Sequence, residues 1–446
     1  MITIMSDMPL KDIMQSHGIV GAGGAGFPSY GKLADGASIL VVNAIECEPL
    51  IYTDFTLMQE HLDEIVAGMR LVMEFAHIPQ GLLCVKGYRA QKLGLSDGQV
   101  LAEGITVKHL PNVYPMGDEI NLIYTATGRL VKPGCLPITQ GVIVYNAETL
   151  YNVALAVNKN QPVTEKWITI SGDVPEVLCI KAPIGMKIAD VLAACKVTVD
   201  DQHVVIDGGP SMGAIKNPHA DVITKTTKAL LILPNHIPAV VGKMRTAAEN
   251  LRMAASLCCQ CSRCTDLCPR HLMGYPIEPH KMVRSTLSAA QLTPELVKNA
   301  SLCCGCDVCG TFACCQGISP MQVIKEYKSI LAKNRIRYEA GPEEVFTAHI
   351  DRDGRMLSAG KWKEMLGVAR FDRYPTYVPE KLTAKKVEIR MSQHIGAPSV
   401  PSVAVGDTVT EGQIIANCGT GLSVPQYASI SGRVTFVDNT RIVIEA

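Results

Sequence analysis

The cysteines of this chain are concentrated in one short segment. Eleven of the 17 lie between residues 258 and 315, in two runs. The runs follow two related motifs, Cys258-x2-Cys261-x2-Cys264-x3-Cys268-Pro269 and Cys303-x2-Cys306-x2-Cys309-x4-Cys314. A two-residue spacing lets one tight turn present its thiolates to different iron atoms of a single iron–sulfur cluster. The segment is therefore expected to fold around metal clusters.

The last cysteine of each run is expected to bind the cluster that the other run holds. It lies too far along the chain to close the same cube, so it reaches across to the second cluster. The sequence predicts two [4Fe–4S] clusters, a pattern similar to that of bacterial two-cluster ferredoxins, which transfer single electrons. The expected ligands of cluster one are Cys258, Cys261, Cys264 and Cys314. Those of cluster two are Cys268, Cys303, Cys306 and Cys309.

Other interpretations of these cysteines fit less well. Zinc sites use paired Cys-x2-Cys motifs with longer gaps, and disulfide frameworks need an oxidising compartment. Cys259, Cys304 and Cys315 adjoin proposed ligands and are interpreted as small buried hydrophobic residues. Cys315 remains an alternative to Cys314, because four residues separate Cys309 from Cys314. Free cysteines in this number indicate a reducing cytoplasm.

Length and composition limit the remaining possibilities. A chain of 446 residues suggests about three domains, or four if some are small. Lys and Arg total 42, as do Asp and Glu, so no bulk charge attracts nucleic acid or an anionic membrane. The longest apolar stretches, such as 229–234, are too short to span a bilayer. We expect neither a nucleic-acid partner nor a transmembrane segment.

A second motif lies near the N-terminus, Gly21-Ala22-Gly23-Gly24-Ala25-Gly26-Phe27-Pro28. Four glycines in six residues do not suit the interior of a helix or strand. They allow backbone N–H groups to approach a phosphate or a flat ring, and Lys32 supplies a cation nearby. The preceding segment, Ile13–Val20, is closer to helix than to strand, so the Rossmann fingerprint is not met.

This loop resembles the flavin loop of the complex I flavoprotein subunit and of the Rnf electron-transport C subunit. Three further stretches match in the same order, Val42–Pro49, Tyr114–Glu119 and Asn146–Thr149. Ala22 and Tyr145 depart from the complex I pattern and favour the Rnf-like branch. The resemblance implies the following FMN-binding residues: Gly21, Gly23, Gly24, Gly26, Lys32, Asn43, Glu46, Gly117, Asp118 and Asn146. It implies contact with the nicotinamide nucleotide for Phe27, Glu48 and Glu119.

The residue types suit these roles. Backbone N–H groups and Lys32 can meet the FMN phosphate, while Asn43 and Asn146 can satisfy ring N–H and C=O groups. Phe27 can stack on a ring. We assign no side chain as a catalytic acid or base, because the hydride chemistry belongs to the cofactors.

The expected fold class is a multidomain α/β chain. Residues 1–160 are assigned to a complex I flavoprotein-like FMN/NADH domain, and residues 165–236 resemble a soluble-ligand-binding β-grasp (SLBB) domain, for which we favour a packing role. Residues 240–335 form the helical ferredoxin-like domain with two [4Fe–4S] clusters. Residues 336–385 are expected to be a linker with little regular structure. Residues 386–446 resemble a β barrel-sandwich hybrid, which lacks the lysine of a lipoyl or biotinyl carrier beyond Lys386.

The whole chain resembles the Rnf C subunit family, with the barrel-sandwich domain at the other end. It looks most like the cobalamin reductases of propanediol-utilisation microcompartments. This resemblance implies an NADH-dependent oxidoreductase that passes single electrons from FMN through two clusters to a corrinoid, cob(III)alamin or cob(II)alamin. It also implies a cytoplasmic location inside a bacterial microcompartment, with a shell protein or an adenosyltransferase as partner. Two other interpretations stay open, a component of a membrane-associated Rnf-type complex and a scaffold with vestigial cofactors.

Overall fold

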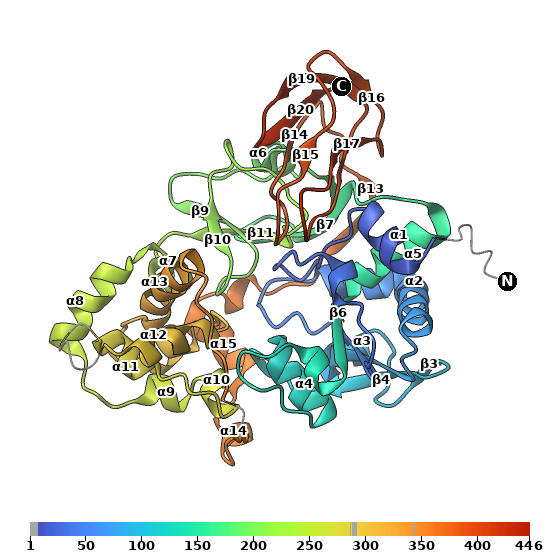
Figure 1. Ribbon diagram of the computed structural model, residues 1–446. Coiled ribbons are helices and arrows are strands. Elements are labelled where there is room, and N and C mark those ends of the chain that lie inside the picture. The colour runs from blue at the N-terminus through green and yellow to red at the C-terminus, as the bar shows by residue number, and fades with distance from the viewer. Residues whose placement is uncertain (1–7, 286, 288–291, 342–343) are drawn as a thin grey trace.

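The structure is a computed structural model that describes residues 8–285, 287, 292–341 and 344–446. Residues 1–7 of the expected first domain and residues 342–343 of the expected linker lie outside this part. Figure 1 shows the arrangement: a blue and cyan N-terminal part, a green sheet, a yellow and orange helical part, and a red β domain. The helical part and the N-terminal part lie side by side, and the red domain stands above them.

A five-stranded sheet forms the centre of the N-terminal part, in the order β3-β4-β2-β1-β6. Its strands are β1 (Ile39–Asn43), β2 (Gln80–Lys86), β3 (Val100–Ala102), β4 (Ile105–Leu110) and β6 (Val142–Asn146). All are parallel except β3, which runs antiparallel at the edge. Alternate apolar residues bury both faces of β1: Leu40 and Val42 enter one core, Ile39 and Val41 the other.

Five α-helices cover this sheet: α1 (Leu10–Ser16), α2 (Thr53–Phe75), α3 (Gly87–Lys92), α4 (Glu119–Thr127) and α5 (Ala147–Lys159). Helices α2 and α5 share one core, and α4 lies in the other. Helix α5 begins after β6 because the Asn146 side chain accepts the N–H of Glu148. Strands β1 and β6 both end in asparagine at the same sheet edge, where open α/β sheets bind ligands.

A six-stranded sheet follows, in the order β10-β9-β11-β7-β8-β13. Its strands are β7 (Glu165–Gly172), β8 (Leu178–Pro183), β9 (His203–Asp207), β10 (Ala214–Lys216), β11 (Ala229–Pro234) and β13 (Thr376–Lys381). Helix α6 (Ile188–Ala194) packs on it through a shared apolar core. This sheet occupies the region expected for the β-grasp domain and takes its last strand from the segment expected to be a linker.

The helical part carries both cysteine runs. Its α-helices are α7 (Pro238–Met244), α8 (Ala247–Leu257), α9 (Arg263–Asp266), α10 (Pro269–Leu272), α11 (Pro279–Arg284), α12 (Pro294–Asn299) and α13 (Pro320–Lys333). A π-helical turn, η5 (Val308–Ala313), contains Cys309 and ends directly before Cys314. Among the described residues, no helix is both long enough and apolar enough to cross a membrane.

The segment 336–385 contains more regular structure than the linker expected there. It forms α14 (Arg352–Arg355), β12 (Leu357–Ser358), α15 (Ala359–Leu366), η6 (Ala369–Phe371) and β13. Strand β12 pairs with β5 (Val113–Tyr114), and β13 pairs with β8. These elements are short and pair with distant segments, so the local sequence has no long periodic pattern that would reveal them.

Trp362 of α15 joins three parts of the molecule. It is fully buried, its ring stacks on Tyr114 with centroids 4.7 Å apart, and its Nε1 donates to Ser211 Oγ at 3.1 Å. The Tyr114 hydroxyl lies 3.0 Å from the carbonyl oxygen of Cys306, which belongs to the second cysteine run. We call this group of contacts among Trp362, Tyr114, Ser211 and Cys306 the Trp362 joint.

Replacing Trp362 with alanine is expected to lower the free energy of unfolding by about 3–5 kcal/mol, because it empties a buried aromatic site. Trp362→Phe is the matched control: it keeps a ring on Tyr114 but loses the bond to Ser211 and the volume of the second ring. Denaturant unfolding followed by circular dichroism measures both variants. Equal losses would show that a ring stacked on Tyr114 contributes nothing by itself.

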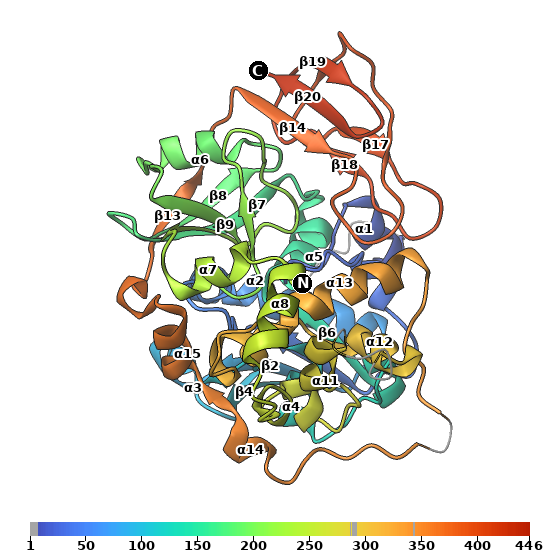
Figure 2. The same ribbon diagram turned by 90° about the vertical axis from the view of Figure 1, so that its left-hand side faces the viewer.

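The C-terminal domain is a sandwich of two small sheets. One contains β14 (Lys386–Arg390), β16 (Thr408–Val409), β19 (Gly432–Val437) and β20 (Arg441–Glu445). The other contains β15 (Val400–Pro401), β17 (Ile414–Asn417) and β18 (Gln426–Tyr427). Figure 2 shows this red domain above the green sheet, with its lower loops beside α1. The Tyr30 hydroxyl donates to the Ser423 carbonyl at 3.2 Å, so the sandwich contacts the segment after the glycine-rich loop.

Candidate functional site

A cavity of about 400 Å³ opens at the carboxyl edge of the five-stranded sheet. The glycine-rich loop, the ends of β1 and β6, and the segment 136–138 line it. This volume lies in the range of small-molecule and cofactor sites. Its lining includes eight of the residues predicted to hold FMN or the nicotinamide nucleotide: Gly21, Gly23, Phe27, Lys32, Asn43, Gly117, Glu119 and Asn146.

The glycine-rich loop is folded so that its backbone faces this cavity. The N–H of Gly21 donates to the Phe27 carbonyl at 2.8 Å, which closes the loop on itself. The N–H of Ala22 donates to Thr149 Oγ1 at 3.0 Å, which fastens the loop to α5. Gly24 has a φ of +107°, a conformation that residues with a side chain rarely adopt. Glycine is therefore required here by the backbone conformation.

The polar groups of the cavity suit an anionic, hydrogen-bonding ligand. Lys32 Nζ donates to Glu119 Oε1 at 3.0 Å and to the Val144 carbonyl at 2.9 Å. The hydroxyl of Ser29 is buried and has no hydrogen-bond partner among the described residues. One cation and a glycine-rich backbone in the wall fit a flavin mononucleotide.

A buried network of charges fixes Asn146 at the end of β6. Asn146 Nδ2 donates to Asp54 Oδ2 at 2.8 Å, and Lys228 Nζ donates to Asp54 Oδ1 at 2.6 Å. Lys228 also pairs with Glu148, as does Lys166. Burial opposes ionisation of Glu148, but the two lysines outweigh it and hold the pKa of this carboxyl below its usual value. Both lysines come from the part of the chain that forms the second sheet, which therefore helps to hold the cavity wall.

Three predicted acidic residues do not line the cavity and have partners elsewhere. Glu46 accepts the backbone N–H groups that begin α2 and pairs with Arg89. Glu48 accepts from the Tyr114 hydroxyl and from the N–H of Ser211, each at 2.8 Å. Asp118 caps α4 and pairs with Arg270 at 2.6 Å. Their proposed cofactor contacts stay predictions, as do those of Gly24 and Gly26, which are also outside the cavity lining.

Sequence reasoning does not select several residues of the cavity wall. Thr149 belongs to the Asn146–Thr149 motif, where its spacing of three from Asn146 places it one turn along the same helix. Ser29 follows the glycine-rich loop directly. Tyr145 stands out in the sequence only as a departure from the complex I pattern, yet its hydroxyl donates to the Ser29 carbonyl at 2.7 Å. The apolar residues Leu136 and Ile138 carry no motif that would reveal them.

Both cysteine runs adopt the same turn. Between the first two cysteines, the residue before the second has positive φ, Gln260 at 58° and Gly305 at 76°. The residue after that second cysteine also has positive φ, Ser262 at 60° and Asp307 at 57°. Non-glycine residues rarely adopt this conformation, which clusters at functional sites. The repeated geometry turns successive thiols of each run toward a common point.

The four thiols predicted for cluster two lie around one small cavity. Its lining includes Cys268, Cys303, Cys306 and Cys309, and Cys304 lies beside them. Burial raises the pKa of Cys268 and of Cys309 above the usual range, and neighbouring thiols add to the shift. Iron binding requires thiolates, so loading this site must release protons. The residues fit a cluster held mostly inside the protein.

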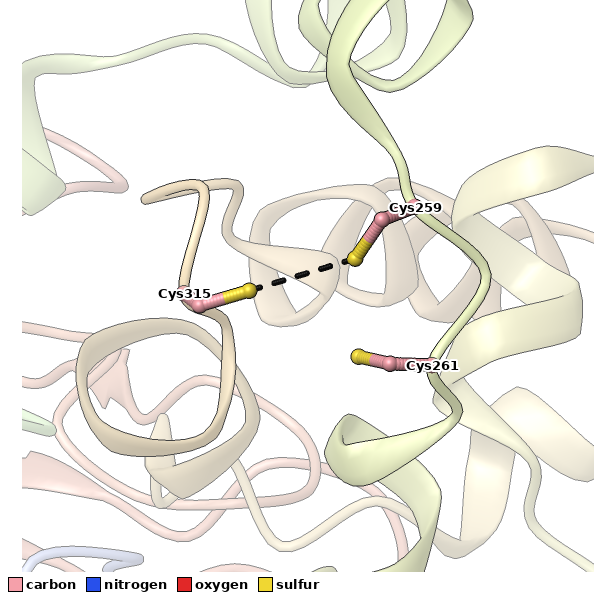
Figure 3. A group of neighbouring side chains, drawn as sticks. All are labelled: Cys259, Cys261 and Cys315. Carbon is pink, nitrogen blue, oxygen red and sulfur yellow. Dashed lines mark hydrogen bonds between the residues drawn. The ribbon is translucent and has the colours of Figure 1, made fainter.

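The four thiols predicted for cluster one also lie together. Burial raises the pKa of Cys264 to about 12, and the thiols that add to the shift are Cys314, Cys261 and Cys258. Cys261 is exposed, whereas three predicted ligands of the second set are buried. Cys259 and Cys315 also gather beside Cys261 (Figure 3). The three sulfur atoms lie within 4.8 Å of one another. The sequence predicts Cys259 and Cys315 to be buried, but they are exposed.

A second hollow lies between the cavity predicted for FMN and the cysteines predicted for cluster two. It has a volume of about 390 Å³ and shares Glu119, Leu136 and Pro137 with the first cavity. Its opposite wall contains Cys303 and Arg270 of the helical part. The predicted cluster two therefore lies next to the N-terminal cavity, and the predicted cluster one lies farther out at the surface.

Replacing Cys261 or Cys306 with alanine is expected to remove one cluster's share of the bound iron, about half of the total, because each cubane needs four thiolates. Cys259→Ala should retain the full iron content, since Cys259 breaks the two-residue spacing that Cys258 keeps. Iron analysis and EPR of the reduced proteins measure this. Loss of half the iron from the Cys259 variant would show that the ligand assignment is wrong.

Comparison with known proteins gives three separate family matches. Residues 14–155 match the Nuo51 FMN-binding domain, residues 257–319 a 4Fe-4S dicluster domain, and residues 376–446 the RnfC barrel sandwich hybrid domain. These matches confirm the expected multidomain class. They also confirm that the cavity and the two cysteine groups lie in domains of the kinds named for FMN and for two clusters.

Curated relatives extend the similarity over nearly the whole chain. Cobalamin reductase PduS of Salmonella typhimurium is 38% identical over 440 residues, which cover 98% of this chain and 96% of the relative. The chain belongs to the cobalamin reductase PduS family. A second member, from Citrobacter freundii, is 34% identical over 99% of this chain and 97% of its own length. The resemblance inferred from the motifs is thereby confirmed.

A more distant relationship links this PduS family member to Rnf-type complexes. The C subunit of the ion-translocating oxidoreductase complex of Rhodobacter capsulatus is 31% identical over 268 residues. That match covers 58% of this chain and 49% of the relative. The shared region therefore accounts for only part of either protein, whereas the match to PduS is close to complete.

Proposed function

We propose that this protein is an NADH-dependent cobalamin reductase, an oxidoreductase that uses FMN and two [4Fe–4S] clusters to reduce a corrinoid. The observation that carries this proposal is the near-complete match to PduS proteins combined with one flavin-sized cavity beside two groups of four cysteines. When bound, FMN would supply the chemistry that converts one hydride from NADH into two single electrons, and the clusters would conduct these.

The protein's own residues bind and position these groups. Lys32 and the glycine-rich backbone would hold the phosphate. Phe27 would present an aromatic face to the nicotinamide nucleotide. The cysteines fix both clusters in one helical domain. Tyr114 and Arg270 fasten that domain to the flavin domain, through Cys306 and Asp118.

A purified, detergent-free protein tests this function directly. We expect NADH to be oxidised while cob(III)alamin is reduced, followed by the absorbance of the corrinoid. The control is the same protein after removal of its flavin, which should not oxidise NADH. If NADH were oxidised with ferredoxin or a quinone but never with a corrinoid, the Rnf-like alternative would be favoured. If neither flavin nor iron bound, the protein would be a scaffold.

We further propose that the protein works in the cytoplasm inside a propanediol-utilisation microcompartment, next to a shell protein or an adenosyltransferase. The support is the family membership together with the resemblance carried by the sequence motifs. Co-purification with intact microcompartments from cells grown on propanediol tests this location. Recovery only in the fraction outside the shells would exclude it.

A further inference from the structure

Two cysteine doublets face each other across the predicted cluster one. The doublets are Cys258-Cys259, after α8, and Cys314-Cys315, after the π-helical turn. Cys258 and Cys314 both have extended backbone, so each doublet sends its two side chains to opposite sides. The first members pack toward a small helical core that includes Ile318. The second members point toward one another and lie beside Cys261 (Figure 3).

The thiols of these second members lie close to one another. Cys259 Sγ and Cys315 Sγ lie 3.9 Å apart, and both residues are exposed. A disulfide needs about 2 Å between the sulfur atoms, so the two thiols must approach further before the bond forms. In the predicted assignment, Cys258, Cys261, Cys264 and Cys314 complete the first set, so the proposal rests on Cys259 and Cys315 not being ligands, although their sulfur atoms lie within 4.8 Å of Cys261 Sγ.

We propose that Cys259 and Cys315 form a reversible disulfide that ties together the two loops supplying the ligands of cluster one. With oxidised glutathione as the oxidant, Cys259–SH and Cys315–SH each lose a proton and one electron to form one S–S bond. The S–S bond of glutathione accepts both electrons and both protons and gives two thiols. Excess thiol reverses the exchange.

The bridge would matter because cluster one is the more exposed of the two. Its predicted ligand Cys261 is exposed. Its four predicted ligands come from two loops, and Cys259 and Cys315 in these loops are 56 residues apart in the sequence. Besides the cluster and the surrounding packing, hydrogen bonds from Arg245 to the Gly317 carbonyl and from the Ser319 N–H to Asn250 join the segments that flank these loops. A disulfide limits how far the loops can separate, so iron should leave cluster one more slowly.

Peptide mapping of the holoprotein tests this proposal. Anaerobic protein is treated with oxidised glutathione, free thiols are alkylated, and peptides are analysed without reduction, with iron counted on the same sample. We expect one cross-linked peptide that contains Cys259 and Cys315, with iron unchanged. Cys135→Ser removes an exposed cysteine of another domain and should still give the cross-link.

The rate of iron loss provides a second readout. Oxidised wild-type protein should release the iron of cluster one to a chelator several-fold more slowly than reduced protein. Cys259→Ser and Cys315→Ser should bind full iron and show no effect of the oxidant. Separate glutathione adducts on the two residues, or no modification at all, would overturn the proposal. So would loss of half the iron from either serine variant, because the residue would then be a ligand.

Discussion

Gly24→Val and Lys32→Ala are both expected to strip FMN from the protein and abolish NADH oxidation with every acceptor. Gly24 has a φ of +107° with open space around its α-carbon, so valine would disturb the loop through backbone strain. Lys32 is the cation of the cavity, and loss of one charged hydrogen bond should weaken FMN binding about 10- to 100-fold. Fluorescence titration with FMN measures both variants.

Two matched controls accompany this experiment. Gly98 also has positive φ and open space around it, but it lies in a turn between α3 and β3 and not in the glycine-rich loop, so Gly98→Val imposes similar strain without changing that loop. Lys196→Ala removes an exposed lysine of the second domain. Both controls should retain FMN. Full flavin content in Gly24→Val, or its loss from Gly98→Val, would contradict the role assigned to the loop.

Cys306→Ala is expected to abolish corrinoid reduction while NADH reduction of a small flavin-reactive dye continues near the wild-type rate. The reason is spatial: Cys306 belongs to the buried set beside the Trp362 joint, whereas the FMN cavity lies in the N-terminal part. Paired assays with dye and cob(III)alamin separate the two half-reactions. Wild-type corrinoid reduction by this variant would show that electrons do not need cluster two.

Cys261→Ala gives the matched comparison for the outer cluster. NADH should still bleach the remaining cluster in this variant, because the second hollow places Cys303 next to the flavin cavity. In Cys306→Ala, NADH should reduce the outer cluster slowly or not at all. EPR after a brief exposure to NADH distinguishes them. If NADH reduced the remaining cluster equally fast in the two variants, the inner and outer positions of the clusters would not determine the order of electron transfer.

The parts of this molecule predicted best are those whose signals are local. The spacing of Cys258 to Cys268 and of Cys303 to Cys309 restricts the chain to tight turns, and the turns are present in both runs. The glycine-rich loop likewise indicates its conformation through its own residues. In each case the residues that make the structure are neighbours in the sequence.

The parts that could not be predicted depend on distant partners. Glu46, Glu48 and Asp118 stand in flavin-loop motifs, but their partners in the fold include residues as far away as Ser211 and Arg270. A motif shows what a residue resembles and does not show which remote group will form its hydrogen bonds. The exposure of Cys259 and of Cys315 could not be predicted for the same reason. Each lies beside a loop of the other cysteine run, which is distant in the sequence.

The Trp362 joint limits how this protein can be divided in the laboratory. A fragment ending near residue 335 would keep the cavity and both cysteine runs, and its sequence alone would suggest a convenient minimal reductase. It would also uncover the apolar face of Tyr114 and leave β8 without its partner β13, and an unpaired edge strand invites aggregation. Segments in the last quarter of the chain thus complete the packing of the first three quarters. Truncations should be placed after β13 rather than before α14.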